Sequence, residues 1–257
     1  TSFGPDFITC TYGAGGSTRD TTLDVVTRVK ETFGLPTASH LTCVGATKDE
    51  LRSYLQEAQQ RNIDYIVALR GDPPQGETEF KPVPGGLRYA NELTALIRAE
   101  FPDFGIAVAG YPETHQEAPN PEEDLANLKR KVEAGADVVV TQLFYDNDDL
   151  FRFRDRYDAA GIKATLVPGI LPVTNLAQIK RITSMCGAKL PQALADSLAE
   201  QEDNAEAQFE IGVRHAVEQV QSLIDAGVPG LHFYVLNKSQ ATSQVLRGVQ
   251  GWRREAG

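Results

Sequence analysis

The chain has 257 residues, 41% of them hydrophobic, and a formal net charge of −10 at pH 7. This length and apolar content suit one large core, and the acidic balance excludes the clustered basic surface that is typical of nucleic-acid-binding proteins. No apolar run approaches the ~20 residues of a membrane span, and no signal peptide is visible, so we expect neither a nucleic-acid nor a membrane partner.

Short apolar segments with β-branched residues predict seven strands, at 7–13, 39–44, 65–69, 105–113, 137–146, 164–171 and 231–237. The segment at 164–171 breaks at Pro168-Gly169. The segments between and after them have helical periodicity, at 20–33, 47–61, 87–100, 121–134, 147–159, 174–186, 205–226 and 239–249. Strands that alternate with helices at intervals of about 30 residues are typical of βα units around a parallel sheet.

The predicted fold class is therefore α/β, and the length matches a (β/α)8 TIM barrel of about 250 residues. A barrel needs eight strands, whereas the chain begins at Thr1, almost directly in a strand. We therefore expect a single catalytic barrel domain over 1–257 that lacks its N-terminal βα unit. An open, doubly wound sheet of seven strands is the alternative.

A glycine-rich segment, Gly13-Ala14-Gly15-Gly16-Ser17-Thr18, follows the first strand and resembles a dinucleotide-binding fingerprint. Its sixth position is a threonine rather than glycine, and no acidic residue follows the second strand near Thr42 to hold a ribose. We interpret the segment as a turn whose Ser17 or Thr18 caps the following helix.

Polar residues directly follow the apolar strands, and the clearest case is Arg70-Gly71-Asp72 after the run at 65–69. Because burying an unpaired charge is costly, we expect these residues at an opening, where α/β folds bind ligands. Thr11 and Tyr111 begin the polar ends of the segments at 7–13 and 105–113, and the segment at 137–146 carries Gln142. The alternative is an Arg70–Asp72 ion pair that anchors a loop.

The helix predicted at 121–134 carries Asp124, Asn127 and Lys131 at spacings of three and four, with Arg130 at the edge of the same face. Two cations beside an amide suit the phosphates and hydroxyls of a nucleotide. The alternative is an ordinary solvated helix face.

The three cysteines, Cys10, Cys43 and Cys186, are widely spaced and form no C-x-x-C pair. We expect reduced thiols in a cytoplasmic protein, and no metal site.

Ten short motifs, in order along nearly the whole chain, resemble those of methylenetetrahydrofolate reductases: TYGAGGSTRD, HLTCVGAT, DELR, YIVALRGDPP, YPETHQEA, LKRKVEAGAD, TQLFYD, RFRDR, PGILPV and LHFYVLN. The resemblance implies a (β/α)8 barrel that binds FAD at the carboxyl ends of its strands and uses NADH or NADPH as co-substrate. It implies ping-pong reduction of 5,10-methylenetetrahydrofolate to 5-methyltetrahydrofolate, which feeds methionine synthesis. The partners would be these small molecules, and a homo-oligomer is compatible with the sequence.

The resemblance also assigns site residues. It implies that FAD is bound by Thr11, His40, Arg70, Gly71, Asp72, Tyr89, Ala90, Tyr111, His115, Ala118, Asp124, Asn127, Arg130 and Lys131. It gives Asp72 a catalytic role, because a carboxylate there disfavours extra negative charge on the reduced flavin. The implied substrate contacts are Asp72, Gln142, Gln178 and Lys238.

Three features depart from the family pattern. The F-E-F-x-P-P motif, whose glutamate is the general acid that protonates the substrate, is absent together with the expected eighth strand. Ile182 replaces a frequent phenylalanine and cannot stack, and Lys238 replaces the arginine of L-N-R, keeping its charge but losing its fork. Two alternatives therefore stay open: a non-catalytic flavin- or folate-binding subunit, and a flavin-free pterin-binding methyltransferase barrel.

Overall fold

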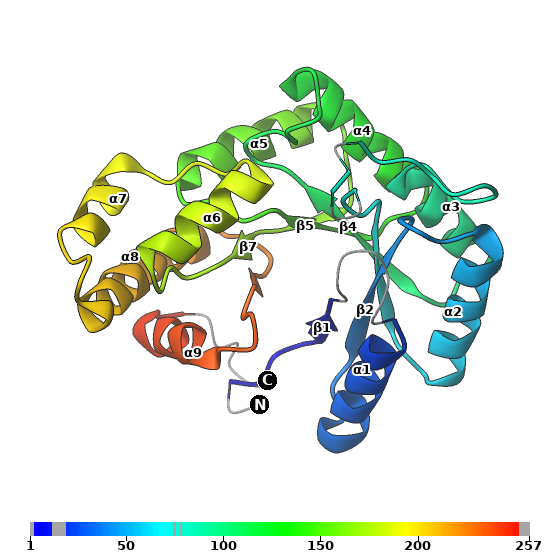
Figure 1. Cartoon of the computed structure of the whole chain (residues 1–257), viewed down its shortest axis with the longest axis horizontal. Helices are drawn as coiled ribbons and strands as arrows, with labels where there is room; N and C mark the ends of the chain where they lie inside the picture. The colour runs from blue at the N-terminus through cyan, green and yellow to red at the C-terminus, as the bar shows by residue number, and fades with distance from the viewer. Residues whose placement is uncertain (1–2, 12–18, 74–75, 78, 252–257) are drawn as a thin grey trace. The chain divides into compact units, whose positions relative to one another are not determined.

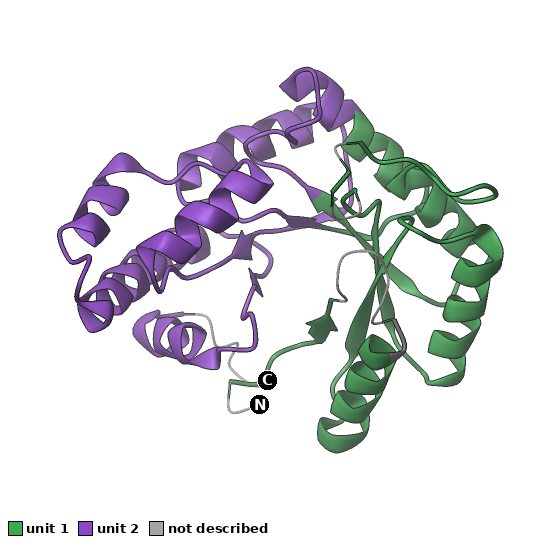
Figure 2. Ribbon diagram, viewed as in Figure 1, with its two compact units in different colours: residues 1–109, 127–139 green, residues 110–126, 140–257 purple. Residues whose placement is uncertain are grey.

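The computed structural model describes residues 3–11, 19–73, 76–77 and 79–251. The glycine-rich segment at 13–18, with its expected helix cap, lies outside the described residues. The chain divides into two compact units (Figure 2), unit 1 (1–109 and 127–139) and unit 2 (110–126 and 140–257). None of the helices described is long and apolar enough to span a membrane.

The described residues form eight strands and nine helices (Figure 1). The strands are β1 (Ile8–Cys10), β2 (Thr37–Thr42), β3 (Tyr65–Leu69), β4 (Gly105–Gly110), β5 (Val138–Thr141), β6 (Thr165–Val167), β7 (Gly169–Ile170) and β8 (His232–Phe233). The helices are α1 (Arg19–Phe33), α2 (Lys48–Gln60), α3 (Ala90–Glu100), α4 (Pro121–Glu133), α5 (Asn147–Ala159), α6 (Leu176–Cys186), α7 (Gln192–Ala199), α8 (Ala205–Asp225) and α9 (Ser239–Gly248). The larger sheet has the order β1-β2-β3-β4-β5-β6, and β7 pairs with β8 in a second sheet. This alternation confirms the predicted α/β class of the (β/α)8 barrel type.

The break predicted at Pro168-Gly169 is confirmed, because the strand at 164–171 is divided into β6 and β7 at Pro168, which has no N–H to donate. The Pro168 carbonyl accepts a hydrogen bond from the His232 N–H at 2.8 Å. One local feature differs from the prediction. Helix α7 was not predicted. It has eight residues, and its N-cap residue, Pro191, makes no side-chain capping hydrogen bond, so the usual start signal is missing.

In unit 1, β1, β2, β3 and β4 pair in parallel, with Cys10 opposite Ser39 and His40 opposite Val67. The Ser39 hydroxyl is buried 2.5 Å from the hydroxyl of Tyr54 on α2. The helix α2 therefore covers the face of β2 that carries Ser39. Because side chains alternate along a strand, His40 points to the other face.

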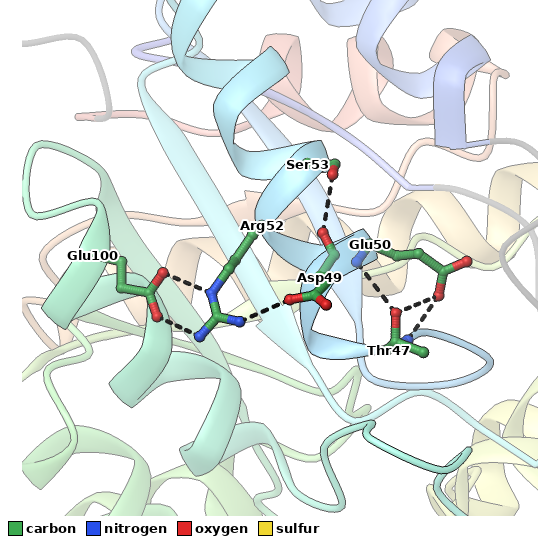
Figure 3. A network of polar contacts seen from close by, with 6 residues as sticks. All are labelled: Thr47, Asp49, Glu50, Arg52, Ser53 and Glu100. Carbon is green, nitrogen blue, oxygen red and sulfur yellow. Dashed lines mark hydrogen bonds and ion pairs between the residues drawn. The ribbon is translucent and has the colours of Figure 1, made fainter.

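Polar contacts at the start of α2 fix this helix (Figure 3). The Thr47 hydroxyl accepts a hydrogen bond from the Glu50 N–H at 3.3 Å, and the Glu50 carboxylate accepts one from the Thr47 N–H at 2.8 Å, which is a capping box. Arg52 makes a forked pair with Glu100 of α3, at 2.8 Å for both bonds. Hydrogen bonding from Arg52 lowers the pKa of the Glu100 carboxyl. Solvent screens exposed pairs of this kind, so they set orientation more than stability.

The core of unit 2 is an apolar cluster between the strand ends and helices α6 and α7. Its buried members are Leu143, Tyr145, Leu171, Val173, Leu176, Ile179, Leu194 and Leu198. The helix α8 approaches this cluster closely at Gly212, where a Cβ atom would overlap the Val173 carbonyl group, 2.6 Å from its carbon. Only glycine permits this approach of helix and backbone.

We expect Gly212→Ala to destabilise the protein, although alanine is the better helix former by about 1 kcal/mol. The added methyl group must displace either α8 or the Val173 backbone, and overpacking of this kind costs roughly 1–3 kcal/mol or more. Urea unfolding followed by circular dichroism measures the change. Gly230→Ala is the matched control, because nothing lies within 4 Å of its Cβ position. Equal stability of both variants would contradict this account of the α8 packing.

Candidate functional site

The polar residues predicted at strand ends lie there. Thr11, Arg70, Tyr111 and Gln142 are each the first residue after β1, β3, β4 and β5, respectively. In unit 1 the strands are parallel, so Thr11 and Arg70 lie at the same edge of the sheet. In unit 2 the Gln142 N–H donates to the carbonyl of Gly110 at 2.7 Å, which places Gln142 beside the residue that precedes Tyr111.

The strand register brings several unit 1 residues to one face of the sheet. Thr11 is one residue past Cys10 and therefore continues the register opposite His40, on the face away from α2. Gly71 lies against the same face with φ +87°, and a Cβ atom there would lie 2.8 Å from Val44 Cγ1 and 3.0 Å from Thr42 Cβ. A side chain at position 71 would therefore collide with the end of β2.

The geometry after β3 decides between the two interpretations of Arg70 and Asp72. The Arg70 Nε donates to the Gly71 carbonyl at 3.1 Å, and the guanidinium carbon lies 5.3 Å from the centroid of the Phe80 ring. Asp72 is exposed and makes no hydrogen bond or ion pair with the described part of the chain. An Arg70–Asp72 ion pair that anchors the loop is therefore not formed, and the Asp72 carboxylate faces solvent.

Tyr89 and Ala90 lie where α3 begins, close to the end of β2. Tyr89 is the N-cap residue of α3 and is 49% exposed, with the Arg88 guanidinium 5.5 Å from its ring centroid. The buried Cys43 thiol donates to the Leu69 and Tyr89 carbonyls, both at 3.6 Å. The start of α3 is thus held near the strand ends of unit 1.

The cations predicted on the helix at 121–134 lie on α4. Lys131 Nζ donates to the carbonyl of Ala109, near the carboxyl end of β4. The exposed Arg130 guanidinium donates to the side-chain oxygen of the exposed Asn127. Lys131 therefore lies against a strand end, which an ordinary solvated helix face does not explain.

The remaining predicted cofactor residues lie in the loop between β4 and α4 or, in the case of Asp124, in the first turn of α4, and all belong to unit 2. The Tyr111 and His115 rings meet edge to face at 4.6 Å. The Asp124 carboxylate accepts a hydrogen bond from the His115 N–H at 3.0 Å, and the Ala118 N–H donates to the His115 carbonyl at 2.9 Å. These contacts make the loop a defined structure around His115.

The two predicted substrate glutamines are oriented in the same manner. The Gln142 side-chain oxygen accepts a hydrogen bond from the Leu143 N–H at 2.9 Å, and the Gln178 side-chain oxygen accepts one from the Thr174 hydroxyl at 3.2 Å. Neither amide nitrogen has a hydrogen-bond partner in the part of the chain that the structure describes. Both side chains therefore present N–H donors.

A cavity in unit 2, of about 420 Å³ including the solvent at its mouth, brings together three residues singled out from the sequence, Gln178, Ile182 and Lys238. Its wall also contains Tyr234 and Leu236, which sequence reasoning did not single out. The motif LHFYVLN contains both residues, but an aromatic residue or a leucine in a predicted strand is normally interpreted as a buried core residue. The approach of β8 to α6 makes them part of the wall.

The described residues contain no group of three His, Cys, Asp or Glu residues that could hold a metal ion. The three cysteines are free, and burial raises the pKa of the Cys43 thiol to about 12. At neutral pH this thiol is therefore protonated, which suits a packing role.

Comparisons with known proteins agree on one family. A family model described as methylenetetrahydrofolate reductase matches residues 1–250. The 5,10-methylenetetrahydrofolate reductase of Escherichia coli K12 is 42% identical over 239 residues, which cover 93% of this chain and 78% of that protein. Methylenetetrahydrofolate reductase (NADH) 1 of Zea mays is 39% identical over 256 residues, which cover 96% of this chain and 43% of the maize protein.

One solved structure shares the fold. It is an uncharacterized protein from Clostridium thermocellum that binds two copies of 5-methyl-5,6,7,8-tetrahydrofolic acid. The TM-score is 0.55 at 13% sequence identity, and the match covers 94% of this chain and 92% of that chain. At this identity the likeness shows the fold alone.

Protonation of His232 should lower the free energy of unfolding at acidic pH. This histidine lies beside the cavity residue Tyr234, with 5.0 Å between the ring centroids. Burial lowers the pKa of His232 to about 4, against about 6.5 in an unfolded chain. Between these values the unfolded state binds a proton that the folded state does not, so stability decreases as the pH falls from about 6.5 to 4. We expect His232→Gln to reduce the loss of unfolding free energy between pH 7 and pH 5 by roughly 1–2 kcal/mol. Urea unfolding at both pH values measures this, and parallel pH dependences would contradict it.

Proposed function

The chain belongs to the methylenetetrahydrofolate reductase family, and we propose that it reduces 5,10-methylenetetrahydrofolate to 5-methyltetrahydrofolate with NADH or NADPH, through bound FAD in a ping-pong sequence. The observation that carries the proposal is the unit 2 cavity, in whose wall Gln178, Ile182 and Lys238 lie together. The resemblance of the sequence relates these same three positions to the substrate side of the reaction. A cytoplasmic setting and a single catalytic domain over 1–257 are parts of the same proposal.

The residues of unit 1 fit a flavin dinucleotide. Arg70, Arg130 and Lys131 supply cations for its phosphates, and in the structure their side chains donate to neutral oxygens of Gly71, Asn127 and Ala109. Gly71 keeps the end of β3 free of a side chain that would collide with β2. Bound FAD would supply the hydride chemistry, while Thr11, His40, Tyr89 and Ala90 of unit 1 and Tyr111, His115, Ala118 and Asp124 of unit 2 would hold it.

Asp72 is the residue to which we assign electrostatic tuning. Its carboxylate is exposed and has no cationic partner in the described part of the chain, so its charge is not neutralised locally. A carboxylate in this state disfavours further negative charge nearby. The proton that opens the imidazolidine ring of the substrate must come from an acid, and we assign no residue of this sequence to that role.

The cavity and Gln142 fit a folate in complementary ways. The amide nitrogens of Gln142 and Gln178 can donate to the oxygen and ring nitrogens of a pterin, because their oxygens are already engaged. Lys238 offers a point charge to the glutamate carboxylates, and Ile182 offers an apolar surface to the aromatic part of the substrate. The maize relative is named as NADH-dependent, and we propose that NADH be tested first as the reductant here.

Arg130→Ala and Lys131→Ala should each weaken FAD binding, because each removes a cation from the proposed pyrophosphate contact. The loss of one hydrogen bond to a charged group costs roughly 1.5–3 kcal/mol, which is about ten- to hundredfold in Kd. Fluorescence titration of the apoprotein with FAD measures the change. Lys129→Ala is the control on the same helix, since Lys129 lies 4.0 Å from Glu133 and outside the assigned set. Wild-type affinity for FAD in both test variants would contradict the assignment and would support the alternative, that these cations lie on an ordinary solvated helix face.

Asp72→Asn should separate the two half-reactions. The substitution keeps the shape of the side chain and removes its charge, so the flavin potential should rise, with faster reduction by NADH and slower reoxidation by methylenetetrahydrofolate. Stopped-flow absorbance follows both steps in the product of the full coding region, together with potentiometry. If Asp72→Asn leaves the potential and both rates unchanged, the tuning role of Asp72 is wrong.

The same experiments distinguish the alternative functions on the wild-type protein. A flavin-free methyltransferase barrel would show neither flavin absorption nor FAD binding. A non-catalytic subunit would bind FAD or folate but would complete neither half-reaction. Reduction by NADH followed by reoxidation with methylenetetrahydrofolate supports the proposed reductase.

A further inference from the structure

Three segments of unit 2 meet at the end of β5. The Tyr234 hydroxyl, just after β8, donates to the Thr141 carbonyl at 2.8 Å. The Gly169 N–H, at the start of β7, donates to the Thr141 hydroxyl at 2.9 Å in a buried position. Thr141 is fully buried, the bond from Gly169 is buried, and the bond from Tyr234 is partly buried.

The packing around Gly169 at this junction leaves no room for a side chain at that position. A Cβ atom at Gly169 would overlap the Thr141 carbonyl oxygen and would lie 2.7 Å from Cε2 of the Tyr234 ring. Burial raises the pKa of the Tyr234 hydroxyl, so it remains a donor over the whole useful pH range. The ring is therefore packed against Gly169 on one side, with its hydroxyl directed at the backbone of β5.

The carbonyl that accepts from Tyr234 belongs to the peptide group whose nitrogen is that of Gln142. This peptide is held from both sides, because the Gln142 N–H donates to Gly110 at 2.7 Å while the Thr141 carbonyl accepts from Tyr234. The orientation of the peptide determines the direction in which the Gln142 side chain leaves the backbone. Tyr234 also lines the cavity with Gln178 and Lys238, so it links the cavity wall to Gln142.

We propose that Tyr234 is a positioning residue for the substrate site, which acts through the Thr141 carbonyl to fix the Gln142 amide. The inference rests on the proposed function, because it takes folate as the ligand of Gln142. If Tyr234 acts in this way, its hydroxyl contributes to folate affinity only while Gln142 is present.

The test is a double-mutant cycle on binding of 5-methyltetrahydrofolate, measured by isothermal titration with wild type, Tyr234→Phe, Gln142→Ala and the double variant. Tyr234→Phe should weaken binding roughly three- to tenfold, the equivalent of one neutral hydrogen bond. In the Gln142→Ala background the same substitution should change the Kd by less than about twofold, since residues that act through one group are not additive. Equal effects in both backgrounds would overturn the proposal, because the hydroxyl would then act on the ligand independently of Gln142.

The matched control is Tyr157→Phe. The buried Tyr157 also donates its hydroxyl to a backbone carbonyl of unit 2, that of Ala164 at 2.7 Å, but it is outside the cavity wall. Tyr157→Phe should lose similar thermal stability and keep wild-type folate affinity, and weakened binding in this variant would assign the Tyr234 effect to general loss of packing.

A second measurement needs no ligand. Hydrogen exchange at the Gln142 and Leu143 amides should be faster in Tyr234→Phe than in wild type and unchanged in Tyr157→Phe. Unchanged exchange in Tyr234→Phe overturns the positioning role by itself. A wild-type protein that does not bind the folate overturns the proposed function, and this inference with it, whereas wild-type binding with an additive cycle overturns this inference alone.

Discussion

The strand β3 consists of buried apolar residues over most of its length, and this burial restricts where a charged side chain can be placed. In β3, Ile66, Val67 and Ala68 are buried, and the first charged residue, Arg70, follows the strand immediately. A charge two residues earlier would have to be desolvated at a cost of several kcal/mol. Since the strands of unit 1 are parallel, the same restriction on each strand collects the polar residues at one edge.

This restriction also explains what the sequence could predict. Seven β segments and eight of the nine described helices could be predicted from apolar runs and from helical periodicity, because the pattern of buried apolar residues is visible in the sequence. The position of Thr11, Arg70, Tyr111 and Gln142 follows from the same pattern, since each is the first residue after an apolar run. The division of β6 from β7 depends on a missing N–H at Pro168, which the sequence also signals.

Features that depend on long-range partners could not be predicted. In the sequence, Tyr234 resembles an ordinary core residue. Its proposed positioning role depends on the Thr141 carbonyl, which is 93 residues away in the chain. The absence of an Arg70–Asp72 ion pair is likewise visible only in the structure, where the Arg70 guanidinium carbon lies 5.3 Å from the centroid of the Phe80 ring. Helix α7 is short and has no side-chain cap, so the sequence does not signal it. Its two buried leucines are recognised as core residues only from the apolar cluster with which they pack.

The protein carries a net charge of −10, yet the residues assigned to phosphate binding are cations placed against neutral backbone. Lys131 bonds the Ala109 carbonyl and Arg70 bonds the Gly71 carbonyl, so a backbone contact helps to orient each side chain. The glutamines follow the same logic, because a backbone N–H or a threonine hydroxyl occupies the oxygen of each amide and leaves its nitrogen as the outward group. In each case the chain uses an internal neutral contact to fix the direction of a donor. Under the proposed function, the cations of unit 1 would contact a pyrophosphate and the glutamines of unit 2 a pterin, both of which are rich in acceptors. The apolar Ile182 in the unit 2 cavity wall would contact a part of the ligand that has no acceptors.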